Sequence, residues 1–293
     1  TEIYGVHIML KFYLIILILF FNSCTTNVFW EDPSKTELNI SGYVISENNH
    51  TSVPIAVWAE ELNHHSFTDS NGYFSIPISG TQSSKGNLSG EISVYFFIHN
   101  YQLDSSIVNF TNGELSKYQS DFSEEGVLLD TIKLKKLFSG KMELHFGSNS
   151  LNSYDTVSAS FHLNTFLDVS LKTYKYTAYQ SDFYSGLIFK SLNSNTFSFY
   201  RFSMNNEAGN TTYDQLNTIN YDKNLEVTWN YNILSNSLFL DLDVYEVFPF
   251  FIISHGNIAM RIIQDIAGDS AMSFSKHYLK IPCDIIPDTL VIN

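Results

Sequence analysis

Cysteine is scarce in this chain of 293 residues, which contains only Cys24 and Cys283. A fold stapled by several disulfides is therefore excluded, and Cys283 has no partner within the chain if Cys24 carries another covalent group. Glycine and proline are sparse too, at 14 and 6 residues, which excludes collagen-like and proline-rich architectures. No Cys/His signature surrounds Cys283, so we interpret it as a small buried apolar side chain.

Positive charge is the second scarcity. Lys and Arg total 16 against 30 Asp and Glu, and the formal net charge is −14. A body this acidic repels nucleic-acid phosphates and anionic lipid surfaces, and no basic cluster offsets the repulsion, so we expect no nucleic-acid partner. Aromatic residues, by contrast, are abundant, with 24 Phe and 18 Tyr. They supply enough apolar surface for a folded core, and the length suffices for two ordinary domains.

The amino-terminal segment has the composition of an export signal. Met9-Leu10-Lys11 is followed by the uncharged apolar run 12–21 and then by Asn22-Ser23-Cys24. The apolar run is too short to span a bilayer comfortably, because a span needs about 20 residues. Met9 fits the start of such a signal, and residues 1–8 would then be an upstream extension.

The stretch Phe21-Asn22-Ser23-Cys24 resembles the lipobox, the processing site of bacterial lipoproteins. Its last two residues match the motif well, whereas its first two depart from the strict form. The resemblance implies cleavage before Cys24, lipid such as palmitate on that cysteine, and a tether over residues 24–36. It also implies the bacterial cell envelope, with the outer membrane as the expected location, on its periplasmic or surface face. An ordinary signal peptide and a retained anchor helix within residues 1–23 are the alternatives.

Beyond residue 36 the hydrophobic pattern has a period of two. Apolar and polar residues alternate over short segments separated by Asn, Ser, Gly and Asp clusters, which predicts antiparallel strands with one buried face. The expected fold is all-β, with two consecutive antiparallel β-sandwich-like domains, residues 37–136 and 137–293, after the signal helix. The second domain could equally be an open barrel, and residues 257–267 fit either a short helix or a strand.

The first domain contains a tight turn and a set of residues around it, namely Gly42, Pro54, Thr68, Asp69, Gly72 and Phe74. This pattern resembles a known family, the carboxypeptidase regulatory-like domain, which is a transthyretin-like (prealbumin-like) β-sandwich. Asp69 can bond the turn backbone, Gly72 supplies a positive φ, and Phe74 points into the core. Val53 departs from the family, which usually has Gly before the proline. The resemblance implies an accessory, non-catalytic module, and the second domain resembles no family.

Local motifs for chemistry are absent. Asp241 and Asp243 share one face of a predicted strand, but no calcium loop surrounds them. His145 and His162 stand on separate strands and lack the third ligand that zinc requires. No serine-hydrolase elbow, zinc-protease, phosphate-loop or dinucleotide motif is present. We therefore predict no metal, no cofactor and no catalytic residue.

Aromatic residues in the second domain suggest a ligand class, because exposed rings stack on sugar faces. They include Tyr174, Tyr176, Tyr179, Phe183, Tyr184, Phe197, Phe199 and Tyr200. The predicted function is a non-catalytic binding or scaffolding module, held on the membrane through lipid on Cys24, with carbohydrate, peptide or another envelope protein as partner. The alternative is a lipid-anchored hydrolase with its site in residues 137–293.

Overall fold

Strands make up most of the regular structure, and the all-β expectation is confirmed. The computed structural model describes residues 38–47, 52–78, 88–146, 156–178, 180–205, 211–234 and 240–292. Contacts divide the chain into Thr1–Leu38 and Asn39–Asn293. The predicted lipidation site, Cys24, and its tether lie outside the described residues. Within the described ranges, no helix has the length and apolar character needed to cross a membrane.

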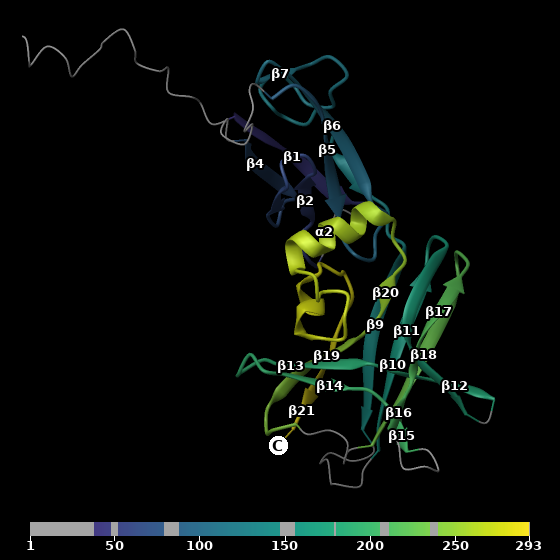
Figure 1. Cartoon of the computed structure of the whole chain (residues 1–293). Coiled ribbons are helices and arrows are strands. Elements are labelled where there is room, and N and C mark those ends of the chain that lie inside the picture. Colours follow the sequence, from purple (N-terminus) through teal and green to yellow (C-terminus); the bar gives the residue numbers. More distant parts are fainter. Residues whose placement is uncertain are drawn as a thin grey trace, which may run out of the picture. The chain divides into compact units, whose positions relative to one another are not determined.

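The first half, residues 38–136, folds into two sheets with a core between them (Figure 1). Phe74 from the smaller sheet meets Phe96 from the larger one, with ring centroids 5.7 Å apart. The smaller sheet has the order β4-β1-β8 and the larger one β3-β2-β5-β6-β7. The pairs of the larger sheet are antiparallel, whereas β1 and β8 of the smaller sheet are parallel. The strands are β1 (Leu38–Ser46), β2 (Ala56–Ala59), β3 (His64–Phe67), β4 (Tyr73–Ile78), β5 (Gly90–Phe97), β6 (Asp104–Thr111), β7 (Glu114–Ser116) and β8 (Ile132–Leu134).

The turn before β4 is built by its own side chains. Asp69 Oδ1 accepts bonds from the backbone N–H of Asn71 at 2.8 Å and of Tyr73 at 2.9 Å. Gly72 has a φ of +81°, and its carbonyl accepts a 2.8 Å bond from Val44 N–H on β1. A Cβ at Gly72 would come within 2.4 Å of the Val44 carbonyl oxygen, so only glycine fits both the conformation and the close approach.

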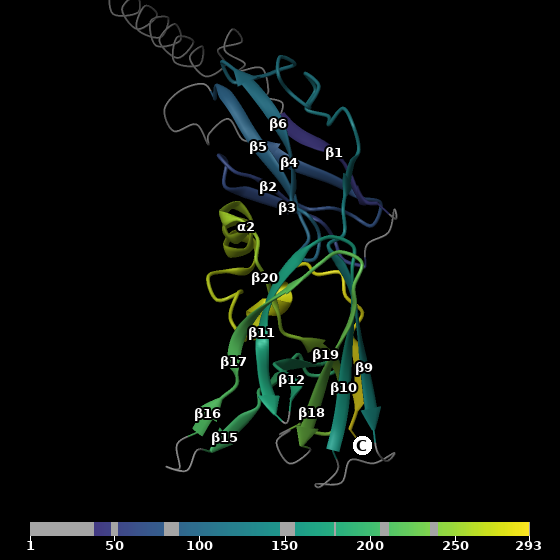
Figure 2. The same ribbon diagram turned by 90° about the vertical axis from the view of Figure 1, so that its right-hand side faces the viewer.

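The second half, residues 137–292, has three sheets and a small hairpin around one core (Figure 2). The sheet orders are β18-β10-β9, β12-β11-β17 with β20 also on β11, and β14-β13-β19-β21, and the hairpin is β15-β16. Trp229 and Tyr231 of β18 are fully buried in this core, together with Phe161 of β10. The strands are β9 (Phe138–Phe146), β10 (Thr156–Thr165), β11 (Val169–Ala178), β12 (Ser181–Ser185), β13 (Leu187–Ser191), β14 (Phe197–Tyr200), β15 (Ser203–Asn205), β16 (Thr211–Tyr213), β17 (Gln215–Tyr221), β18 (Glu226–Leu234), β19 (Val244–Pro249), β20 (Ile252–Ile253) and β21 (Asp288–Val291).

The ambiguous segment 257–267 is a helix, α2 (Asn257–Ala267), and the short 3-10 turn η2 (Lys276–Lys280) follows it. One face of α2 is fully apolar, with Ile262 and Ile263 at 0% exposure. That face packs against Trp58 of β2 and Phe97 of β5. In both views α2 lies next to β2 (Figures 1 and 2). The two halves therefore share a hydrophobic cluster, and the predicted domain boundary at residues 136/137 stays a prediction.

Candidate functional site

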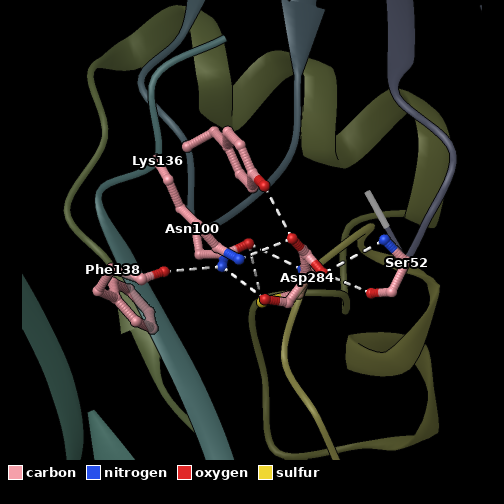
Figure 3. Close-up of polar contacts among 7 residues, drawn as sticks. Ser52, Asn100, Lys136, Phe138 and Asp284 are labelled. Carbon is pink, nitrogen blue, oxygen red and sulfur yellow. Dashed lines mark hydrogen bonds and ion pairs between the residues drawn. The ribbon is translucent and has the colours of Figure 1, made fainter. Parts of the chain in front are cut away.

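A densely bonded polar group is Asp284, which follows η2 and reaches the first half (Figure 3). Its Oδ2 accepts a 2.8 Å bond from Lys136 Nζ and a 2.7 Å bond from the Tyr101 hydroxyl. Its Oδ1 accepts bonds from the hydroxyl and the backbone N–H of Ser52. Asn100 holds the Asp284 backbone from both sides, since it accepts from the N–H and donates to the carbonyl, each at 2.8 Å.

This cluster is a structural link between the halves. Burial alone would raise the pKa of Asp284, but bonds from Lys136, Ser52 and Tyr101 outweigh burial and lower it. Both carboxylate oxygens are already bonded, so the carboxylate has little capacity left for a ligand. The neighbouring Cys283 thiol is half-buried, and burial raises its pKa, which disfavours a reactive thiolate. This agrees with the interpretation of Cys283 as a packing residue.

A second charged group is Asp214, between β16 and β17, and its carboxylate can accept further hydrogen bonds. Its side chain is 0% exposed, and its Oδ2 accepts a bond from the Ser185 hydroxyl at the end of β12. Its Oδ1 lies 3.5 Å from Arg201 Nε but has no hydrogen-bond partner among the described residues. Burial raises the pKa of Asp214, and the bond from Ser185 and the charge of Arg201 only partly offset it.

Aromatic rings fix the arginine beside this carboxylate. The Arg201 guanidinium lies 4.8 Å from the ring centroid of Tyr174 and 4.2 Å from that of Tyr213. Tyr176 is stacked on both faces, with Phe202 at 4.2 Å and Phe183 at 5.3 Å, so it has no face left for a ligand. Tyr213 is 55% exposed, and Arg201 covers one of its faces. Tyr213 is therefore the ring that a ligand can reach.

These residues border a cavity of about 310 Å³, which we call the Asp214 cleft. Its described lining is mixed, with aromatic and polar side chains from β11, from β17 and from the residues around them. The lining residues are Lys175, Tyr176, Thr177, Phe202, Tyr213, Asp214, Gln215 and Asn217. Such a mixture of one accessible ring, a buried charge pair and several amides is suited to a ligand that carries many hydroxyl groups.

A third feature is an apolar cavity of about 430 Å³ between the halves, walled by Val53, Phe67, Phe248, Tyr278 and Ile281 among others. His99 is fully buried in its wall, and Nε2 of His99 accepts a 3.4 Å bond from Ile253 N–H. Its Nδ1 has no partner among the described residues. Burial lowers the pKa of His99 well below its usual range, and the nearby His255 adds to the effect, so the ring is neutral near pH 7.

The family-pattern residues of the first half lie around one turn. Gly42 packs against Leu128, Phe74 is 1% exposed, and the Thr68 hydroxyl accepts a 3.0 Å bond from Ile55 N–H. Pro54 lies just before β2, on the lining of the apolar cavity. These contacts explain the turn structurally, and Pro54, Thr68, Asp69 and Gly72 also line a cavity of about 740 Å³.

The metal candidates do not assemble in the described part of the chain, where no group of three potential ligands occurs. His145 is paired with Ser158 and His162 with Lys141 on β9 and β10, so the two histidines are not opposite each other. Asp243 precedes β19, which begins at Val244, so the expected strand face with Asp241 is absent. Its carboxylate accepts bonds from Ser191 and Asn193 instead.

No protein-family model, no curated protein and no solved structure matches this chain. The resemblance to the carboxypeptidase regulatory-like domain therefore stays a prediction carried by the turn residues.

Proposed function

We propose that this chain is a non-catalytic envelope binding protein that recognises a saccharide at the Asp214 cleft. The observation that carries the proposal is the Arg201–Asp214 pair, whose buried carboxylate has one oxygen without a hydrogen-bond partner among the described residues and lines the same cleft as the exposed ring of Tyr213. A buried acceptor without a partner costs free energy, and a ligand donor that reaches it recovers that energy.

The ligand class follows from the groups on offer. The free face of Tyr213 can pack on the apolar face of a sugar ring, and Asp214 can accept from a hydroxyl. The Gln215 side chain is exposed at the rim and can bond a second hydroxyl.

Binding is favoured over hydrolysis by the number of carboxylates. Most glycoside hydrolases need two carboxyl groups that flank the scissile bond. Asp214 is the only carboxylate among the described residues that line the cleft. A saccharide held there would meet one acid in a buried ion pair, which suits recognition better than turnover.

The cleft is tested by glycan-array binding of the full chain, followed by titration of the best glycan. Tyr213→Ala removes the ring and Asp214→Asn removes the charge, and we expect each to weaken binding at least tenfold. Tyr118→Ala is the control, because Tyr118 is 78% exposed in the first half, far along the chain from the cleft. Unchanged affinity in both cleft variants would refute the site, and release of cleaved sugar would favour the hydrolase.

Membrane attachment is proposed at Cys24, on the lipobox resemblance. Two or more acyl chains hold a protein stably on a bilayer, whereas one chain gives only reversible binding. Radiolabelled palmitate should enter the wild-type protein and not Cys24→Ala. Equal labelling of the two proteins would refute attachment at this residue, without bearing on the cleft.

A further inference from the structure

Two adjoining cavities of opposite character meet at η2. One is the apolar cavity of about 430 Å³, and the other, of about 500 Å³, is lined by basic side chains. They share Phe248, Leu279 and Lys280 in their walls. Lys280 lines both cavities, so a basic rim borders the apolar one, and we call the two cavities together the compound cavity.

The apolar cavity has the size and the walls of a small-molecule site. Ligand pockets range over roughly 300–1,000 Å³ and are lined mainly by apolar groups with a few polar ones. Val53, Pro54 and Phe67 come from the first half, while Ile281 and Ile285 come from the second. A ligand in this cavity would therefore contact both halves of the protein.

The basic rim is unusual in a chain whose net charge is −14. Lys190, Lys276, His277 and Lys280 line the second cavity together. Lys190 is 2.8 Å from Glu246 and is thereby neutralised. Neither Lys276 nor Lys280 has a carboxylate of a described residue within ion-pair distance, so both ammonium groups can bind an anion.

We propose that this compound cavity binds a free fatty acid, with the alkyl chain in the apolar cavity and the carboxylate at Lys276 and Lys280. The chain replaces water against the apolar walls, and the two ammonium groups hold the head group. The site shares no described lining residue with the Asp214 cleft, so it is independent of the saccharide proposal.

A free single-chain amphiphile fits the site better than a bilayer lipid. The acidic body of the protein is repelled by an anionic membrane surface, whereas one soluble amphiphile carries a single charge to a local basic rim. The cavity is also bounded by both halves of the fold, so a lipid in a bilayer would have to leave its leaflet to enter.

The test uses the full chain in lipid nanodiscs with a dodecanoate that carries a photoreactive diazirine at its chain end. After irradiation, mass spectrometry should place the crosslink on residues of the apolar cavity, such as Val53 or Ile281. Unlabelled dodecanoate should compete about 250-fold better than octanoate, because it buries four more methylenes and each contributes about fourfold in affinity. Dodecanol, which lacks the charge, should compete at least tenfold less well than dodecanoate.

Variants separate this site from partition into the bilayer. Leu279→Trp fills the shared wall and should abolish the crosslink, while Lys276→Gln with Lys280→Gln should weaken dodecanoate at least tenfold and leave dodecanol unchanged. Lys117→Gln is the control, since that side chain is 70% exposed in the first half. The proposal would be overturned by crosslinks outside the cavity, by equal competition from octanoate, or by lysine variants that leave dodecanoate binding unchanged. It would also be overturned if anionic phospholipid in the nanodisc blocked the crosslinking.

Discussion

At the scale of single residues, the fate of a buried charge depends on how many of its bonds are already made. Asp284 and Asp214 are both carboxylates next to a cation, yet bonded neighbours lower the pKa of the first and burial raises that of the second. The bonds of Asp284 join the two halves, whereas one oxygen of Asp214 has no hydrogen-bond partner in the described part of the chain. We therefore assign stability to the first and recognition to the second.

Asp284→Asn should destabilise the fold by about 3 kcal/mol, because it leaves Lys136 without its counter-ion in a partly buried site. Urea unfolding followed by circular dichroism measures the change. Glu124→Gln is the matched control, since Glu124 and Lys117 form an exposed ion pair at 3.3 Å. It should cost less than about 1 kcal/mol. Equal effects of the two substitutions would show that Asp284 is not a link between the halves.

His99 and His255 should make the protein less stable in mild acid. Burial lowers the pKa of both rings below the ordinary value of 6.5, so below that pH the unfolded chain binds more protons than the folded one. Stability should then fall by about 1 kcal/mol per histidine for each pH unit below 6.5, until the folded rings protonate.

The comparison for this prediction is His99→Gln, measured by urea unfolding between pH 7.5 and 5.5. The variant should lose less stability than the wild type over this range, because one of the two rings is gone. Asp214 acts in the opposite direction, since its raised pKa favours the folded state as the pH falls. Both proteins contain Asp214, so its contribution cancels when one stability curve is subtracted from the other. Parallel curves for the two proteins would contradict the assignment.

At the scale of elements, alternation in the sequence predicted most of the strands that bury one face. Apolar and polar residues alternate over 225–233 and 157–163, and these segments form most of β18 and the centre of β10. The strand β3 was not expected, because His64–Phe67 shows no alternation and its side chains are half-buried or exposed. Edge strands of this kind are held by backbone pairing with a neighbour, which side-chain pattern does not record.

The helix α2 could not be distinguished from a strand by its sequence alone, and its packing partners explain why it is helical. Ile262 and Ile263 are buried against a sheet of the first half. Ile262→Ala should therefore cost about 3 kcal/mol in urea unfolding, through lost burial and a cavity. Gln264→Ala, on the exposed face of the same helix, should stay within about 0.5 kcal/mol. Similar costs for both would mean that α2 contributes little to the core.

The candidate cleft was only partly predictable, for a related reason. Aromatic residues such as Tyr174 and Tyr176 were expected to form a ligand platform, but both have packing partners. The groups that matter, Ser185, Arg201 and Asp214, come from separate segments and form no local motif. One signal was available in the sequence, since Arg201 is one of only two arginines and lies among aromatic residues.

At the scale of the whole molecule, the question is whether the two halves are stable independently of each other. The sequence predicts separate domains joined near residue 136. In the structure, the Asp284 cluster and the α2 cluster join the halves, and Asn39–Asn293 is one compact unit by its contacts. Separating the halves at either the Asp284 cluster or the α2 cluster would expose apolar or charged groups that the other half covers. Unfolding of one half should therefore destabilise the other.

We expect a single unfolding transition for residues 39–293, and two tryptophans can report on it. Trp58 lies in the first half and Trp229 in the second, and both are at most 1% exposed. In the Trp30→Phe/Trp229→Phe variant the remaining fluorescence reports on the packing of the first half against α2, and in the Trp30→Phe/Trp58→Phe variant it reports on the core of the second half. In each variant the fluorescence midpoint in urea should coincide with the midpoint from circular dichroism, because shared burial makes the unit cooperative. Separate midpoints would instead show two independently stable domains, and Asp284→Asn would then leave one transition unchanged while it shifts the other.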